Sequence, residues 1–301
     1  MCLLFNWYKS YDSLIHKIFD DRRYRFEYVG YSTSGYVISV DLLKEDMKIY
    51  NTNKLLVKIV VIYKDSLIWY SDKHKNICKR FMTLEEYNKE ITTLLKLKDQ
   101  NVDIVSELHE TKIIDHSNKL LIKIFKILYK VLSDEEIYTL LDLSEIVRKD
   151  KINLGIIVME NHEDYNTLYY VLNKYNLDYR TRVYLYALAL HCIEILHYNG
   201  IYHGDYHLSN ILVRQKKKIY GDKRLLNWSI KVIDFGRSSI IDEKDLVNYR
   251  HNIKSGNFDI DNELKYYESK NDDLYKWIKL KYEDINIKMY MNILRAIYFE
   301  E

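Results

Sequence analysis

Proline is absent from all 301 residues of the sequence. At the usual frequency of about 5%, a chain of this length would contain roughly 15 prolines. The 30 tyrosines, like the many Ile, Lys and Asn residues, have A/T-rich codons, whereas proline has C-rich codons, so the absence reflects a genomic bias. Motifs that normally include proline are therefore expected to be altered here for reasons unrelated to function.

Cysteine is also scarce, with only Cys2, Cys78 and Cys192 in the whole sequence. Their odd number and wide spacing exclude a disulfide framework and the usual zinc-ligand spacings, and they fit a reducing compartment. The N-terminal stretch MCLLFNWYKS lacks the basic leader and the long apolar core of a secretory signal. We therefore expect a cytoplasmic protein.

Neither an excess of one charge nor a long hydrophobic run is present. The 46 Lys and Arg nearly cancel the 44 Asp and Glu, so no long-range field favours nucleic acid or an anionic membrane as a partner. The apolar run at 55–63 is broken by Lys58 and is too short to span a bilayer. With 48% hydrophobic and 30% charged residues, the chain is expected to be globular, with one large bilobal domain or two ordinary ones.

Hydrophobic patterning predicts an α+β fold. A short helical extension is expected within residues 1–25, and residues 83–98 have the spacing of a helix that begins with a Thr83–Glu86 capping box. Short strands are predicted at 25–31, 36–43 and 55–63, with a polar break at 44–54.

The second half of the sequence is predicted to be mainly helical. Residues 117–152 are predicted to be an inserted helical segment, residues 154–160 a buried strand, and residues 179–200 a long buried helix that ends at Gly200. A hairpin with a basic tip follows. The expected organisation is an extension (1–25), a region with the sheet and the insert 117–152 (26–160), and a mainly helical region (161–301).

Glycines punctuate the first two predicted strands in the stretch VGYSTSGYV, which contains Gly30, Ser32, Gly35 and Val37. Glycine at a strand turn lets backbone N–H groups approach phosphate oxygens because no Cβ stands in the way. An ordinary hairpin turn is the alternative.

Lys58 lies in the apolar strand predicted at 55–63. A buried ammonium is costly unless it meets an anion, although a snorkelling or edge-strand lysine would also fit. Glu90, on the helix that follows, could hold this ammonium toward the phosphates of a nucleotide, or could simply be solvated.

The stretch YHGDYHLSNIL, at 202–212, places an acid and an amide between a buried helix and an apolar strand. Asp205 could accept the proton of a substrate hydroxyl, and Asn210 could offer its amide oxygen to a metal. Asp234, at the start of Asp-Phe-Gly and at the end of the next strand, has a carboxylate that suits Mg²⁺. A polar loop without chemistry is the alternative.

Five elements thus follow one another in the sequence: the glycine-rich stretch, Lys58, Glu90, the loop with Asp205 and Asn210, and Asp-Phe-Gly. In this order they resemble the signature set of the protein-kinase-like superfamily, from about Tyr28 to about Trp277. The resemblance implies a bilobal fold with a small antiparallel-sheet N-lobe, one main helix in that lobe, and a reduced, mainly helical C-lobe. It also implies ATP and Mg²⁺ as cofactors, a protein substrate, and transfer of the γ-phosphate to a Ser or Thr hydroxyl.

The roles implied by the resemblance can be stated residue by residue. Lys58 would bind the α- and β-phosphates, Glu90 would position Lys58, and Asp205 would be the catalytic base. Mg²⁺ would be held by Asn210 and Asp234. The nucleotide would also contact the glycine-rich stretch (Gly30, Ser32, Gly35, Val37) and the hinge beside the adenine (Met159, Glu160), and His207 stands where many Ser/Thr kinases have a lysine beside the γ-phosphate.

The stretch at 202–212, which matches the catalytic loop of kinases, departs from the usual kinase motif. Gly204 replaces the arginine that pairs with a phosphorylated activation segment. We therefore expect an enzyme that is active as first synthesised. If activity instead depended on phosphorylation of that segment, Arg237 or Arg250 would be the first candidate to have replaced the arginine. The form H-G-D-x-H-x-x-N also resembles aminoglycoside and choline kinases, so a small-molecule kinase is one alternative and a pseudokinase scaffold is another. Ser32 also replaces the middle glycine of the first motif.

The chain is short after Gly236, and no Ala-Pro-Glu motif follows it. Together with the genomic bias, this resembles the divergent kinases of large cytoplasmic DNA viruses, which would place the protein in the host cytoplasm. The stretch at 271–280 is a candidate helix, in which Asp272 or Asp273 would brace the catalytic loop or begin a solvated helix. The pattern makes no prediction of oligomeric state.

Overall fold

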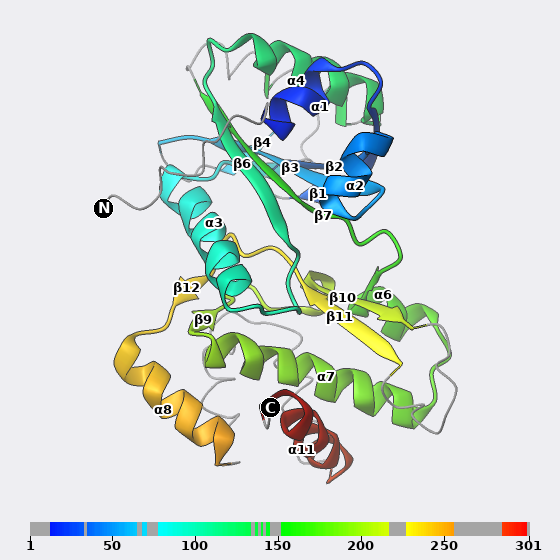
Figure 1. Cartoon of the computed structure of the whole chain (residues 1–301), viewed down its shortest axis with the longest axis vertical. Helices are drawn as coiled ribbons and strands as arrows, with labels where there is room; N and C mark the ends of the chain where they lie inside the picture. The colour runs from blue at the N-terminus through cyan, green and yellow to red at the C-terminus, as the bar shows by residue number, and fades with distance from the viewer. Residues whose placement is uncertain are drawn as a thin grey trace. The chain divides into compact units, whose positions relative to one another are not determined.

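The computed structural model has an α+β fold (Figure 1) and falls into two compact units, Met1–Asn88 with Glu107–Asn161 and Lys89–Ser106 with His162–Glu301. It describes residues 13–32, 35–64, 68–70, 78–133, 136–137, 140, 143–144, 152–216, 227–255 and 285–299. The predicted hairpin tip and the predicted helix at 271–280, with Asp272 and Asp273, lie outside these residues.

A five-stranded antiparallel sheet forms the centre of the first unit, in the order β1-β2-β3-β7-β6. Its strands are β1 (Arg25–Ser32), β2 (Gly35–Asp41), β3 (Lys54–Ile62), β6 (Leu108–Ile114) and β7 (Asn153–Glu160). The central strand β3 is almost continuously buried because it pairs with β2 on one side and β7 on the other. The predicted strands are confirmed, and a small hairpin of β4 (Ile68–Tyr70) and β5 (Cys78–Arg80) accompanies them.

The edge strand β6 has no counterpart in the prediction. Its sequence, LHETKII, has four consecutive residues that are only partly buried, so it lacks the apolar alternation by which strands are recognised. The strand forms because β6 pairs with β7 along six positions, which the sequence pattern of β6 alone does not indicate.

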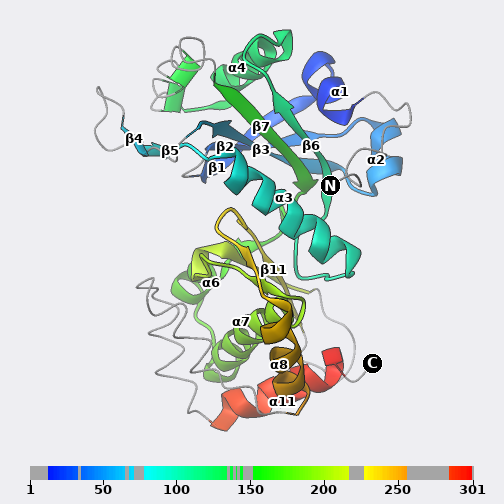
Figure 2. The same ribbon diagram turned by 90° about the vertical axis from the view of Figure 1, so that its left-hand side faces the viewer.

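Helices cover one face of this sheet, where α1 (Leu14–Asp20) and α4 (Lys119–Val131) lie side by side (Figure 2). The apolar residues of α1 and α4 join those of the strands in one core. From α4, the buried residues are Leu120, Leu121, Ile124 and Leu128. The helical prediction is therefore confirmed for the described part of the insert, and this part covers the sheet.

The start of helix α3 (Leu84–Asp99) lies against the opposite face of the sheet. The predicted capping box is present: the Thr83 backbone N–H donates to Glu86 Oε2 (2.8 Å), and the Glu86 N–H donates to Thr83 Oγ1 (3.1 Å). Tyr87 passes over Gly155 and donates its hydroxyl to the Ile156 carbonyl (2.9 Å). A Cβ at position 155 would lie 2.5 Å from the Tyr87 ring, so glycine is required there.

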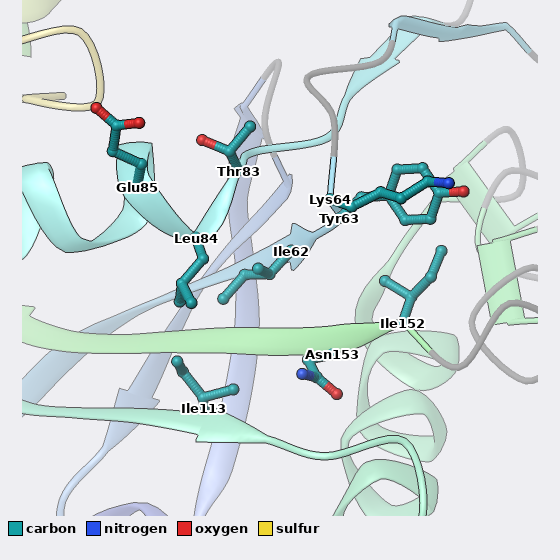
Figure 3. Close-up of a pocket in the computed structure, with 9 residues that line it drawn as sticks. All are labelled: Ile62, Tyr63, Lys64, Thr83, Leu84, Glu85, Ile113, Ile152 and Asn153. Carbon is teal, nitrogen blue, oxygen red and sulfur yellow. The ribbon is translucent and has the colours of Figure 1, made fainter.

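A cavity of about 640 Å³ opens beside this contact (Figure 3). Its walls include Ile62 from the end of β3, Leu84 from α3, Ile113 from β6 and Asn153 from β7.

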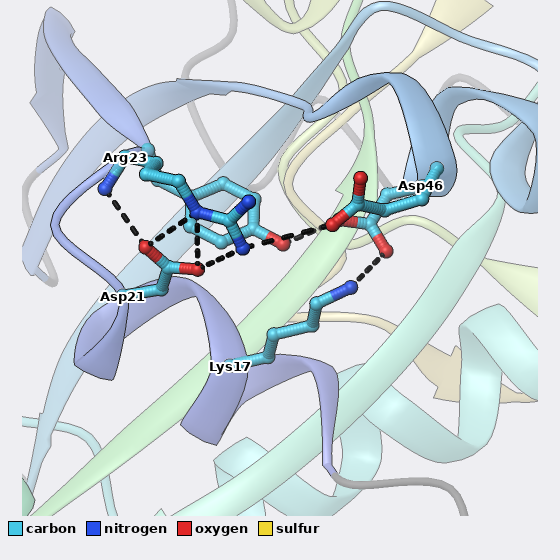
Figure 4. A network of polar contacts seen from close by, with 6 residues as sticks. Lys17, Asp21, Arg23 and Asp46 are labelled. Carbon is cyan, nitrogen blue, oxygen red and sulfur yellow. Dashed lines mark hydrogen bonds and ion pairs between the residues drawn. The ribbon is translucent and has the colours of Figure 1, made fainter.

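A buried carboxylate joins two helices of the first unit (Figure 4). Asp46, on α2 (Lys44–Tyr50), is buried and accepts hydrogen bonds from Lys17 Nζ (2.6 Å) and from the Tyr24 hydroxyl. Burial and the bond to Asp46 raise the pKa of Tyr24. The predicted break between the strands is therefore present, and residues 44–50 within it form a helix that the pattern did not predict, because partners from another part of the chain satisfy its buried carboxylate.

The second unit is built around α7 (Tyr179–Tyr198), which is buried over most of its length. The helices α6 (Leu168–Lys174), α8 (Glu243–Lys254) and α11 (Ile285–Phe299) belong to the same unit. As predicted, α7 ends before Gly200, which adopts φ +76°. None of the helices in the described ranges is long and apolar enough to cross a bilayer.

Short strands complete the second unit, so its described part is not purely helical. A three-stranded sheet has the order β11-β10-β8, and a separate ladder pairs β12 with β9. Their bounds are β8 (Asn166–Thr167), β9 (Ile201–Tyr202), β10 (Ile211–Gln215), β11 (Trp228–Val232) and β12 (Ser239–Ile240). The predicted hairpin is confirmed in β10 and β11.

Candidate functional site

The β10–β11 ladder brings together two of the predicted motifs. Ile211 pairs with Val232, and the Ile233 N–H donates to the Asn210 carbonyl (3.0 Å). Asn210 and Asp234 therefore leave the same end of the ladder. Asp234 adopts φ +64°, a left-handed conformation that is uncommon outside glycine and that is concentrated in turns and functional sites.

Hydrogen bonds fix the loop between β9 and β10. Asn210 is 8% exposed, and its Nδ2 donates to the Asp205 carbonyl (2.9 Å). Because the amide nitrogen is used in this way, the amide oxygen is the group left to bind a cation. Tyr206 is buried and donates its hydroxyl to the Ala189 carbonyl on α7 (2.6 Å), so the loop is anchored to the core helix.

His203 connects the loop to the strand that precedes Asp234. The imidazole is fully buried, with Nε2 2.9 Å from the Ile233 carbonyl and Nδ1 3.3 Å from the Asp205 N–H. A carbonyl requires a donor and an N–H requires an acceptor, so these contacts assign the neutral tautomer with its proton on Nε2. Burial lowers the pKa of His203 to about 4, against the opposing effects of the Ile233 carbonyl and nearby carboxylates.

The Asp-Phe-Gly segment continues into a tight turn. Phe235 is buried and packs on the His203 ring, with 4.8 Å between centroids. Ser238 Oγ donates to the Phe235 carbonyl (2.7 Å) and lies 2.8 Å from Thr93 Oγ1 on α3. The prediction did not include Thr93 in the site. Its only sequence signal is a small polar residue among the apolar positions of a helix.

Asp205 is the partly exposed acid of the loop, with 30% of its side chain accessible. Its Oδ1 accepts a hydrogen bond from the Arg237 guanidinium at 3.0 Å. His207 has a local structural task, because its Nδ1 accepts the Ser209 N–H (3.2 Å) and caps the short 3₁₀ helix η1 (Leu208–Asn210).

Lys58 and Glu90 are both buried, with 6% and 2% of their surfaces exposed. Lys58 lies in the middle of β3, opposite Val37 on β2 and Ile157 on β7. The alternative of a snorkelling or edge-strand Lys58 and the alternative of a solvated Glu90 are therefore wrong. The two residues belong to different units, Lys58 to the first and Glu90 to the second.

The glycine-rich stretch is the β1–β2 hairpin, in which Ser32 pairs with Gly35. Gly35 is required for close strand approach, because a Cβ there would lie 1.9 Å from the Ile59 carbonyl oxygen. Gly30 faces open space and follows a bulge in β1.

The proposed hinge residues lie at the end of β7. Met159 is buried, and the Glu160 N–H donates to the Glu107 carbonyl (2.9 Å). The cavity in Figure 3 is lined by none of the predicted site residues.

The oxygen atoms of Asn210 and Asp234 can be compared with the ligands that a metal ion prefers. Asn210 and Asp234 offer one amide oxygen and one carboxylate at the same end of the ladder. This fits Mg²⁺, which usually binds one or two protein carboxylates and takes its other ligands from phosphates and water. In the described part of the chain no group of three or more His, Cys, Asp or Glu is arranged to hold a metal ion.

No known protein-family model matches the chain, and no curated protein is detectably similar to it in sequence.

Proposed function

We propose that the protein is an ATP-dependent phosphotransferase, and specifically a Ser/Thr protein kinase with a kinase-like bilobal fold. One observation supports this best. The loop that contains Asp205 and Asn210 and the Asp-Phe-Gly segment that begins at Asp234 lie at the same end of the β10–β11 ladder. There a partly exposed Asp205, a backbone-tethered Asn210 and a left-handed Asp234 come from segments joined by direct hydrogen bonds.

In this proposal Asp205 accepts the proton of the acceptor hydroxyl. Arg237 donates to its Oδ1, and among the described residues no hydrogen bond to Oδ2 is present, so Oδ2 would be the oxygen that accepts the proton. The side chain is accessible enough for a protein hydroxyl to reach it. Phosphoryl transfer requires little covalent chemistry from the protein, so positioning and charge neutralisation account for most of the rate.

Asn210 and Asp234 would hold Mg²⁺, which neutralises the phosphate charge when it is bound. Lys58 would bind the α- and β-phosphates from its buried position in β3, because it matches the strand lysine of the kinase signature set. Glu90 would position Lys58, and Met159 and Glu160 would contact the adenine. The β1–β2 hairpin, from Gly30 to Val37, would cover the phosphates.

The test is Asp205→Asn, with Asp164→Asn as the matched control because Asp164 is highly exposed. ATP binding, measured by calorimetry with Mg²⁺, should remain nearly intact in both variants. Turnover with labelled ATP should fall by about 10²-fold or more in Asp205→Asn, because the base is lost, and should be unchanged in Asp164→Asn. Wild-type turnover in Asp205→Asn would overturn the assignment of the base.

A small-molecule kinase is the second candidate, because the loop has the form H-G-D-x-H-x-x-N. A panel of basic proteins, acidic proteins, aminoglycosides and choline separates the two. Phosphate transfer to a protein supports the first proposal, and transfer to a small molecule alone supports the second. ATP binding without transfer to any acceptor would favour the pseudokinase scaffold.

A further inference from the structure

The contact between Arg237 and Asp205 joins the residue after Asp-Phe-Gly to the proposed base. Arg237 Nη1 lies 3.0 Å from Asp205 Oδ1, and both residues belong to the second unit. The pair uses one carboxylate oxygen, so it fixes the direction of the carboxylate while it leaves Oδ2 open.

Gly204 makes this contact possible. It adopts φ +76°, and a Cβ at position 204 would lie 2.1 Å from the Arg237 carbonyl oxygen. The backbone of the catalytic loop and the backbone of the turn after Phe235 are therefore in direct contact. No side chain fits between them, so the glycine that precedes Asp205 and the arginine at 237 form a structural pair.

The turn that carries Arg237 is held on both sides of this residue. Phe235 packs on His203, and Ser238 bonds to the Phe235 carbonyl and meets Thr93. The Arg237 backbone is thus fixed by its neighbours, although its side chain is 52% exposed. The other arginine considered from the sequence, Arg250, instead donates to the Tyr198 carbonyl (2.9 Å).

We propose that Arg237 is a positioning residue that holds Asp205 with Oδ2 toward the acceptor hydroxyl, and that Gly204 is required for this arrangement. This rests on the proposed phosphotransferase function. The cation that orients the base is then a permanent part of the chain, so activity does not require a phosphate on the segment that follows Gly236.

The energetics separate this role from a purely structural one. An exposed ion pair contributes little to stability, because water and salt screen it. Loss of Arg237 should therefore hardly change the melting temperature, while misdirection of the base lowers kcat.

The experiment compares Arg237→Met, Arg237→Lys and Gly204→Ala with Arg180→Met, a matched change at an exposed arginine. Arg237→Met should lower kcat by about 10- to 100-fold and leave the KM for ATP within about twofold. Arg237→Lys should recover part of the loss, because an ammonium can bond to Oδ1 but lacks the planar fork of a guanidinium. Arg180→Met should retain wild-type kinetics.

Gly204→Ala should also lower kcat, and adding Arg237→Met to it should produce little further loss, because both changes break the same contact. If the kcat loss in the double variant equals the product of the two single losses, Gly204 and Arg237 do not act through the same contact, and their pairing would be overturned. An unchanged or increased kcat in Arg237→Met would overturn the positioning role, and so would a fall in kcat that is matched by a fall in melting temperature.

A second cycle, on kcat, combines Arg237→Met with Asp205→Asn. Because Arg237 acts through Asp205, adding Arg237→Met to Asp205→Asn should produce little further loss, and a further loss of about 10- to 100-fold would overturn the positioning role. A wild-type chain that transfers phosphate to no acceptor would overturn the proposed function and the positioning role together, whereas transfer by the wild type with an unchanged kcat in Arg237→Met would overturn the positioning role alone.

Discussion

His203 occupies a position where its charge state affects the whole loop. The neutral ring bonds to two backbone groups, the Ile233 carbonyl and the Asp205 N–H, and it has no exposed surface. A second proton would have to be placed on Nδ1, against the Asp205 N–H. The buried ring therefore maintains the loop geometry only while it is neutral.

This predicts a loss of stability in acid. The folded-state pKa of about 4 lies below the unfolded value of about 6.5, so between these values the unfolded chain binds one proton more. The free energy of unfolding is then fully maintained above about pH 6.5 and falls by up to about 1.4 kcal/mol per pH unit as the pH drops toward 4. Urea denaturation at several pH values measures this slope.

The comparison variant is His203→Gln, whose amide can donate and accept without titrating. Its unfolding free energy should fall less steeply over the same pH range than that of the wild type. Equal slopes for the two proteins would contradict the assignment of a buried neutral imidazole.

At the scale of elements, a buried carboxylate joins α11 to α7. Glu194 is fully buried and accepts hydrogen bonds from Arg295 Nε (2.9 Å) and Nη2, while His191 Nδ1 lies 3.1 Å from its other oxygen. Glu194 is in the middle of α7, whereas Arg295 is near the end of the chain. The ion pair therefore fixes how the last described helix lies on the core helix.

Arg295→Ala should destabilise the second unit by about 3–5 kcal/mol, because the buried Glu194 carboxylate loses its guanidinium partner. The double variant Glu194→Gln/Arg295→Met should recover much of this loss, because neither charge remains. Thermal and urea unfolding measure both changes. A double variant that is as unstable as Arg295→Ala would show that packing of the arginine, and not its charge, fixes the helix.

At the scale of the whole molecule, the core of the first unit depends on a helix that precedes the sheet in the sequence. Ile18 on α1 is fully buried in this core, whereas Ile49 on α2 is 64% exposed. Ile18→Ala should lower the free energy of unfolding by about 2–5 kcal/mol, and Ile49→Ala should change it little. Similar losses in the two variants would contradict the packing of α1 on the sheet.

The parts of the fold that were predicted correctly are those with local signals. Strand β3, the Thr83 capping box of α3 and the end of α7 at Gly200 are each specified by neighbouring residues. Helix α2 was missed because its buried Asp46 becomes acceptable only with Lys17 in place. Strand β6 was missed because its burial pattern does not alternate, and because its Glu110 is satisfied by a distant helix, where it accepts the Ile15 N–H.

The candidate site divides in the same way. Asp205 and Asn210 lie in one loop and are five positions apart, so their proximity could be predicted from the sequence. The ion pair of Asp205 with Arg237 could not, because it depends on the close backbone approach at Gly204, which residue spacing does not encode. The burial of Lys58 and Glu90 also depends on tertiary packing. It excludes a snorkelling or edge-strand Lys58 and a solvated Glu90, which the sequence had left open.

The anchoring of α1 has a consequence for synthesis on the ribosome. Ser13 bonds to Glu110, which is 97 positions later, and Asp20 bonds to Lys123, which is 103 positions later. At about 5–20 residues per second, roughly 5–20 s pass before these partners emerge. The first described helix to be translated is therefore among the last to be packed in its unit. During that interval its apolar face, with Ile15 and Ile18, is available to a chaperone.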